Sequence, residues 1–339
     1  VWKPAVARVH EEVADMQKIA GPEVTNEPWD YRYYAEKVRK ERYDLDENEV
    51  KPYLQLEKLR EGMFWVAGEL LGLRFTPVAD VPVYHPDVRV WKVTNAASEL
   101  VRLWYFDPYA RPGKRSGAWM NAYRSQERFE REIRTIVSNN SNFVQGKPGE
   151  PILISWTDAE TLFHEFGHAL HGLSSNVTYP SLAGTSVTRD FVEFLASAFI
   201  DMKLHLAAAG GGVAIDPDKF ERETLAALGM PKEIVMRHRT PHFSHIFSSD
   251  GYSAGYYSYL WADTLTADAW EAFEEAGGAY DKAVAKRLYD HVFSVGNTVD
   301  PAEAYRAFRG KDPGIDALMR DRGFPAPVPV AAAASPVAK

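Results

Sequence analysis

The chain has 339 residues, of which 45% are hydrophobic and 25% charged, a composition suited to a soluble globular protein with a large core. Its net charge of -8 gives a nucleic acid little electrostatic attraction, and its apolar runs are too short to span a bilayer. Cysteine is absent, so a metal ion would have to be held by His, Asp or Glu.

The N-terminal part, to about residue 73, has the pattern of helices. Residues 4–21 end on a glycine stop, and residues 28–43 open with a proline. From residue 73 to 109, β-branched and aromatic residues alternate with polar ones, which predicts a small antiparallel sheet. Two later segments, 135–143 and 151–156, are candidate strands of the same sheet.

From Asp158 onward the pattern is helical again, so the predicted fold is mainly α with a small antiparallel β-sheet. The predicted helices cover residues 158–173, about 190–209, 216–229, 252–275, 281–294 and 301–309. Residues 324–339 are rich in proline and alanine, and we expect them to form a disordered tail. We therefore expect one domain over residues 1–323.

The segment TLFHEFGHALHGL, residues 161–173, contains the motif H-E-x-x-H. On a helix His164 and His168 lie one turn apart on the same face, so both imidazoles can reach one ion. Glu165 lies about 100° around the helix, beside such an ion, where a general base would stand. The alternative is a helix with two histidines and no metal. His171 shares the same face and could contact a substrate or pack against a loop.

A catalytic zinc site needs a third protein ligand. An H-E-x-x-H-x-x-G-x-x-H motif would need glycine at position 171 and histidine at position 174, where the chain has His171 and Ser174. The better candidate is Glu193, in the apolar run of the next predicted helix, with an exposed helix charge as the alternative reading. Asp190 on the same face could orient a ligand histidine.

A second unusual segment, residues 242–265, contains three tyrosines at helical spacing, Tyr252, Tyr256 and Tyr259. Such a stripe is usually core packing. Three buried hydroxyls need partners, however, and a tyrosine or a neutral histidine such as His245 could donate a hydrogen bond to an oxyanion. Both readings stay open on the residues alone.

Several stretches together resemble the M3 family of zinc oligopeptidases. They are TLFHEFGHALHGL, YPSLAGTSVTRDFVEF, MRHRTPHFSHIF and GYSAGYYSYLWAD, with VPVYHPDVRVW, DPYARPGKRSGAWM and SVGNTVDPAEAYRAFRG around them. They occur in the family's order from about Trp29 to Gly323. HEFGHALHGL with RDFVEF is most similar to the dipeptidyl carboxypeptidase branch.

The resemblance implies a helical zincin-like catalytic domain with one zinc ion per chain, held by His164, His168 and Glu193. It implies that Glu165 is the general base and that His245 and Tyr259 stabilise the tetrahedral intermediate. It also implies that Tyr252 and Tyr256 position the substrate. The segment SNNSNF, residues 138–143, would be an edge strand that pairs with an extended peptide.

Two departures from the family pattern are visible. Members are usually about twice as long, so the chain resembles the catalytic half, and the P-S-Q segment that normally follows VEF is absent. Helix 190–209 would then join two family helices.

We expect zinc-dependent hydrolysis of short peptides with release of C-terminal dipeptides. Arg237 and Arg239 are candidates for binding the substrate carboxylate. The alternatives are an endopeptidase like oligopeptidase A and a truncated zinc-binding protein that binds peptides with little or no activity.

We expect a cytoplasmic protein, with the periplasm as the alternative, because VWKPAVARVH lacks the shape of a signal peptide. Its partners would be short peptides, without nucleic acid or membrane, and no pattern in the sequence indicates an oligomeric state.

Overall fold

The computed structural model describes residues 1–44, 46–147, 149–186, 196–209, 211, 214–236, 238–247 and 252–325. They belong to two compact units, which are described separately. The first unit consists of Val1–Asp44, Arg189–Glu271 and Pro313–Lys339, and the second of Leu45–Thr188 and Ala272–Asp312. Helices predominate and accompany one five-stranded sheet, which confirms the predicted fold class.

The sheet belongs to the second unit and consists of β1 (Arg74–Val78), β2 (Arg89–Thr94), β3 (Leu100–Tyr109), β4 (Trp119–Arg124) and β5 (Ile136–Phe143). Its strand order is β1-β2-β3-β5-β4. All pairs are antiparallel except β3 and β5, which run parallel, so the sheet is mixed rather than purely antiparallel. The candidate strand at 135–143 is confirmed, whereas segment 151–156 makes only an isolated bridge between Leu153 and Gln55.

The prediction that SNNSNF is an edge strand was wrong. These residues form most of β5, which lies between β3 and β4, and β4 is the outer strand. The polar side chains of β5 suggested exposure, but Asn139 and Asn140 are buried and hydrogen-bonded to other elements. A buried amide is tolerated when it is satisfied in this way.

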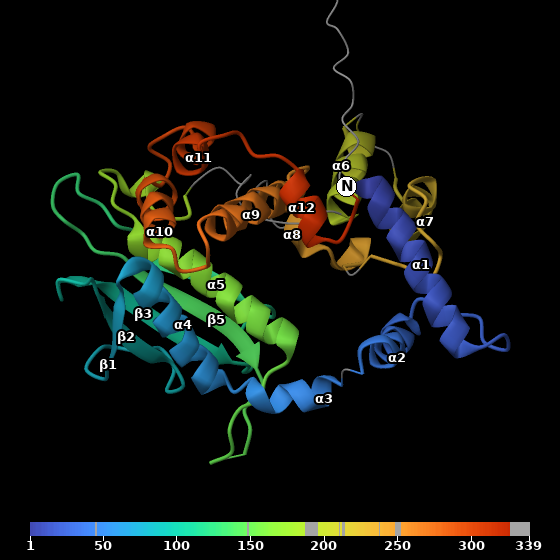
Figure 1. Ribbon diagram of the computed structural model, residues 1–339, viewed down its shortest axis with the longest axis horizontal. Coiled ribbons are helices and arrows are strands. Elements are labelled where there is room, and N and C mark those ends of the chain that lie inside the picture. The colour runs from blue at the N-terminus through green and yellow to red at the C-terminus, as the bar shows by residue number, and fades with distance from the viewer. Residues whose placement is uncertain are drawn as a thin grey trace, which may run out of the picture. The chain divides into compact units, whose positions relative to one another are not determined.

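Two helices, α4 (Leu56–Leu71) and α5 (Trp156–Ser174), lie against one face of the sheet (Figure 1). Their apolar sides meet the sheet in a core that includes Leu56, Met63, Trp104, Phe106 and Phe166. Helix α5 was predicted at 158–173. It begins at a capping box, in which Ser155 Oγ accepts from the Asp158 N–H and the Asp158 carboxylate accepts from the Ser155 N–H.

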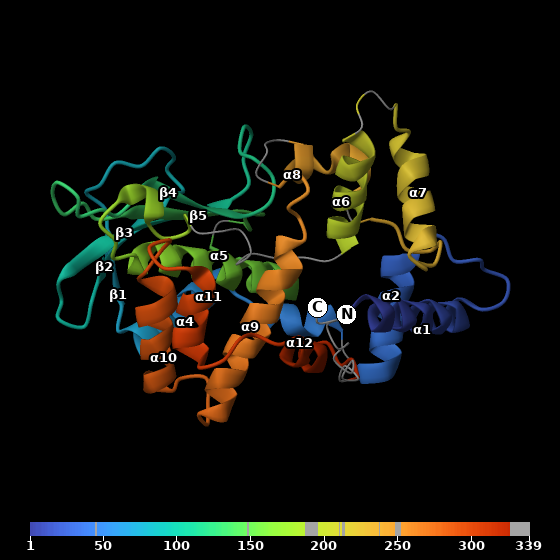
Figure 2. The same cartoon turned by 90° about the horizontal axis from the view of Figure 1, so that it is seen from above.

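The rest of the second unit contains α3 (Glu47–Val50), η1 (Lys51–Tyr53), η2 (Pro180–Leu182), α10 (Lys282–Leu288), η5 (Tyr289–Phe293) and α11 (Pro301–Arg309). Helix α10 packs against α4 and α11 (Figure 2). The predicted helix 281–294 is therefore divided, because its second part forms a π-helical turn. Asp281 and Asp300 cap α10 and α11 through their side chains.

The first unit is helical. Its elements are α1 (Trp2–Ala20), α2 (Tyr31–Tyr43), α6 (Ala196–Ala208), α7 (Pro217–Ala227), η4 (Thr240–His242), α8 (Ser244–Phe247), α9 (Ser258–Glu275), whose last residues extend into the second unit, and α12 (Asp316–Asp321). Its core gathers Ile200, Leu204, Leu225, Phe243 and Tyr256. The predicted helix 252–275 was wrong in its first six residues, because α9 begins at Ser258. Within the described ranges, no helix is both long and apolar enough to cross a membrane.

Candidate active site

The two histidines of the H-E-x-x-H motif converge on α5. The Nε2 atoms of His164 and His168 lie 3.0 Å apart, and the rings are nearly perpendicular. Two nitrogens bound tetrahedrally to zinc at about 2.0–2.1 Å would lie roughly 3.3 Å apart. The pair therefore fits two ligands of one metal ion with little rearrangement.

Burial keeps these imidazoles neutral. It lowers the pKa of His168 to about 4, with a smaller contribution from the neighbouring His164 and His171, and it also lowers the pKa of His164. A neutral imidazole offers the lone pair that a metal needs. Near neutral pH both side chains are in the state that binds metal.

Glu165 lies beside this pair and is only 8% exposed. Burial raises the pKa of its carboxyl to about 7, and a hydrogen bond from the backbone N–H of Met120 opposes the shift. Met120 belongs to β4, so the outer strand of the sheet contacts the predicted base directly. A carboxyl with this pKa can take up and release a proton near neutral pH.

Asn139 anchors the motif helix to the sheet. Its Nδ2 donates to the main-chain oxygen of Glu165 at 2.5 Å, and its Oδ1 accepts from Trp104 Nε1 at 2.6 Å. All three residues are buried. The sequence analysis did not predict this role of Asn139. The signal that could have indicated it is an amide inside a predicted strand that begins with apolar residues.

The side chain of His171 packs against a neighbouring aromatic residue. Its ring stacks on Phe293 at 5.7 Å, and its buried Nε2 has no hydrogen-bond partner within the described residues. Burial lowers its pKa to about 4. These observations favour the packing interpretation of His171.

The three tyrosines gather in the first unit. The ring centroids of Tyr256 and Tyr259 are 4.4 Å apart, and Tyr252 stacks on Tyr259 at 5.7 Å. Tyr256 and Tyr259 are buried in the core, and Phe243 meets Tyr256 edge-on. Only Tyr259 is on α9, so the rings come together through a turn rather than along one helix face. The three tyrosine rings therefore contribute to the core of the first unit.

Asp201 of α6 holds that turn. Its carboxylate accepts from the backbone N–H groups of Ala254 at 3.0 Å and Tyr256 at 2.9 Å, and it lies 2.8 Å from His205 Nδ1. Asp201 is fully buried, and Ala254 has a φ of 53°. The carboxylate satisfies both amides and thereby stabilises a backbone conformation that alanine rarely adopts.

Other predicted site residues are only partly observable. Glu193, Asp190 and Arg237 lie outside the described residues, as does the side chain of His245. Arg239 forms ion pairs with Asp218 and Glu221, so its charge is already compensated. Across the described part of the chain, no three His, Asp or Glu side chains form a group that could hold a metal ion. Within the described residues, His164 and His168 are therefore the two candidate ligands that lie together.

Comparison with known proteins decides the family. The pattern of peptidase family M3 matches residues 2–204 and 195–324, which together span most of the chain. The chain belongs to peptidase family M3. The two matches overlap at residues 195–204, which begin directly after the VEF segment, where the sequence analysis expected a departure from the family pattern.

Relatives within family M3 include two kinds of bacterial peptidase. The chain is 36% identical to the dipeptidyl carboxypeptidase of Salmonella typhimurium, over 95% of its own length and 55% of the relative's. It is 35% identical to the dipeptidyl carboxypeptidase of Escherichia coli, over 94% and 54%. It is 32% identical to oligopeptidase A of Escherichia coli, over 88% and 51%. The chain therefore spans about half the length of these relatives.

Proposed function

We propose that the chain is a zinc-dependent peptidase that cleaves short peptides and releases C-terminal dipeptides. The observation that carries this proposal is the convergence of His164 and His168 beside the buried Glu165, in a chain of family M3. Release of dipeptides rests on the resemblance to the two dipeptidyl carboxypeptidases.

His164, His168 and Glu193 would hold the zinc ion. Bound there, zinc would polarise the scissile carbonyl and lower the pKa of the attacking water. Two neutral imidazoles and a carboxylate are a ligand set that zinc uses in catalytic sites.

Glu165 acts as the general base. Its carboxylate takes a proton from the attacking water and passes it to the leaving amine when the peptide bond breaks. In the metal-free chain burial raises the pKa of Glu165 to about 7. A zinc ion bound beside the carboxyl would lower this pKa and so favour the ionised carboxylate that accepts the proton. His245 and Tyr259 are proposed to donate hydrogen bonds to the oxyanion, and Tyr252 and Tyr256 to position the peptide.

The outer strand β4 is the proposed platform for an extended substrate. It pairs with β5 on one side only, and its Met120 N–H reaches Glu165. An extended peptide added to this edge would run beside the base, with main-chain hydrogen bonds fixing its register. The sequence analysis assigned the pairing with a peptide to β5, and we now propose it for β4.

A peptidase assay on two versions of one short peptide tests the proposal. One version has a free C-terminus, the other is amidated, and each is incubated with and without a chelator. We expect chelator-sensitive release of dipeptides from the free peptide only. Internal cleavage of the amidated peptide would instead indicate an endopeptidase like oligopeptidase A, and no turnover at full zinc occupancy would indicate a zinc-containing peptide-binding protein.

A further inference from the structure

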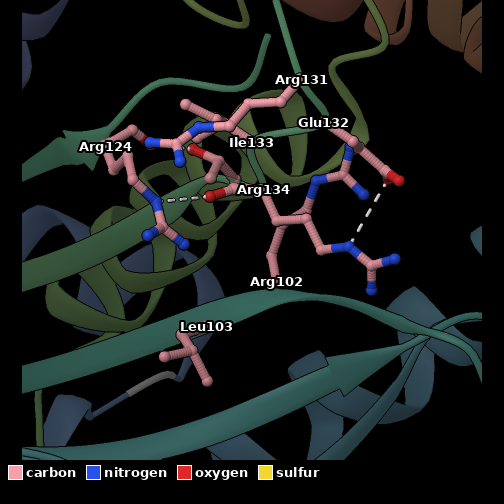
Figure 3. A pocket seen from close by; sticks show the side chains of 8 residues that line it. Arg102, Leu103, Arg124, Arg131, Glu132, Ile133 and Arg134 are labelled. Carbon is pink, nitrogen blue, oxygen red and sulfur yellow. Dashed lines mark hydrogen bonds and ion pairs between the residues drawn. The ribbon is translucent and has the colours of Figure 1, made fainter. Parts of the chain in front are cut away.

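An arginine-lined pocket lies in the second unit and contains none of the candidate active-site residues. Its volume is about 490 Å³. Residues from the first half of β3, the end of β4 and the segment before β5 form its wall, as Figure 3 shows. The lining residues are Arg102, Leu103, Arg124 and the segment 131–135.

The pocket carries an excess of positive charge. Four arginines face it against one carboxylate, Glu132, whose ion pair with Arg134 is long at 3.5 Å and exposed. Arg124 donates through Nε to the main-chain oxygen of Arg134 at 2.8 Å. Because that oxygen is neutral, the hydrogen bond does not compensate the charge of Arg124. In the part of the chain that the structure describes, Arg102, Arg124 and Arg131 have no carboxylate partner. These three guanidinium groups can therefore bind an anion without breaking an ion pair within the described residues.

Arg102 is the most buried of these cations. One Nη donates to the main-chain oxygen of Ser175 at 2.5 Å, while its buried Nε has no hydrogen-bond partner. Burial lowers the pKa of its guanidinium to about 10, so it is still charged at neutral pH. Desolvation is the largest effect on that pKa and the attraction of Glu132 the smallest, so a bound anion would further stabilise the charged guanidinium.

We propose that this pocket binds a small oxyanion with a phosphoryl group, either free phosphate or the phosphate monoester of a small molecule. The planar fork of a guanidinium matches two oxygens of a phosphate, and several forks around one cavity match its charge and its number of acceptors. The volume exceeds that of phosphate alone, which leaves room for an attached small group. The proposal is independent of the peptidase activity, since it uses none of the same residues.

Isothermal titration calorimetry on the full zinc-loaded chain, at constant ionic strength set with chloride, tests this site. The probes are inorganic phosphate and glucose 6-phosphate. We expect saturable binding of at least one. Stronger binding of glucose 6-phosphate would assign the site to phosphate monoesters, and stronger binding of phosphate to the free ion. Absence of saturable binding of both probes would overturn the proposal.

Three variants locate the binding. Arg131→Gln removes an exposed pocket cation and should weaken binding about tenfold. Glu132→Gln removes the competing carboxylate and should tighten it several-fold. Arg74→Gln removes an exposed arginine on β1, outside the pocket, and should bind like the parent. Equal affinities in all three variants would place the anion elsewhere and overturn the proposal.

Discussion

The carboxylate of Asp201 accepts a hydrogen bond of 2.9 Å from the backbone N–H of Tyr256, 55 residues further along the chain. A second oxygen of the same carboxylate accepts from the Ala254 N–H. These two hydrogen bonds hold the turn that directly precedes α9. That turn carries Tyr252 and Tyr256, the two tyrosines proposed to position the substrate, and the buried carboxylate of α6 stabilises it.

Replacing Asp201 with Asn should destabilise the first unit. The asparagine side chain has nearly the same shape as the aspartate. Its NH₂ group must face the backbone N–H of either Ala254 or Tyr256, so one buried N–H loses its acceptor. We expect a loss of about 2–3 kcal/mol in unfolding free energy, measured by urea denaturation of the full chain. Asp218→Asn, at an exposed ion pair, is the matched control and should change stability by less than about 1 kcal/mol. Equal effects of both variants would contradict the role of Asp201.

Asn139→Ala should loosen the contact between the motif helix and the sheet. The change leaves the buried Trp104 N–H and the main-chain oxygen of Glu165 without their partner, at a cost of about 3 kcal/mol. Thermal or urea unfolding measures it. Asn121→Ala, on the exposed side of β4, is the control that should leave stability nearly unchanged. An Asn139→Ala variant as stable as the parent would contradict this role and show that water replaces the amide without loss of unfolding free energy.

The stability of the metal-free chain should depend on pH through Glu165. Because its folded pKa of about 7 is raised from 4.5, the protonated carboxyl favours the folded state at low pH. As the pH rises from about 4.5 to 7, the unfolded state ionises first, and a few kcal/mol of this contribution is lost.

Glu165→Gln cannot ionise and provides the control for that trend. In chelator-treated protein, the stability of the parent relative to this variant should fall between pH 4.5 and 7 and stay level above it. Unfolding free energies at several pH values measure the difference. A difference that does not change with pH would mean that the carboxyl of Glu165 has an ordinary pKa.

Glu193→Ala should weaken zinc retention. Among the described residues only His164 and His168 converge, and two imidazoles hold zinc less tightly than a set of three ligands. Metal content after dialysis measures the effect, and Glu160→Ala, an exposed residue of α5, is the matched control. Full zinc content in Glu193→Ala would place the third ligand elsewhere.

The sequence predicted those parts of the site that depend on local periodicity. His164, Glu165 and His168 lie on one helix because a four-residue spacing requires only helical geometry. Asn139 and Asp201 were not predicted as supports, because their partners are distant in sequence and a polar residue alone does not reveal what it contacts. The same limit explains the strand error: β5 appeared exposed until the parallel pairing with β3 placed it inside the sheet.

Zinc content and peptide turnover, measured together on the parent chain and on Glu165→Gln, test the central claim most directly. Both proteins should retain one zinc ion, while turnover of an unblocked peptide should fall about 10²- to 10⁴-fold in the variant, since only the base is lost. Glu160→Gln should match the parent. Equal turnover in Glu165→Gln and the parent would contradict the proposed mechanism.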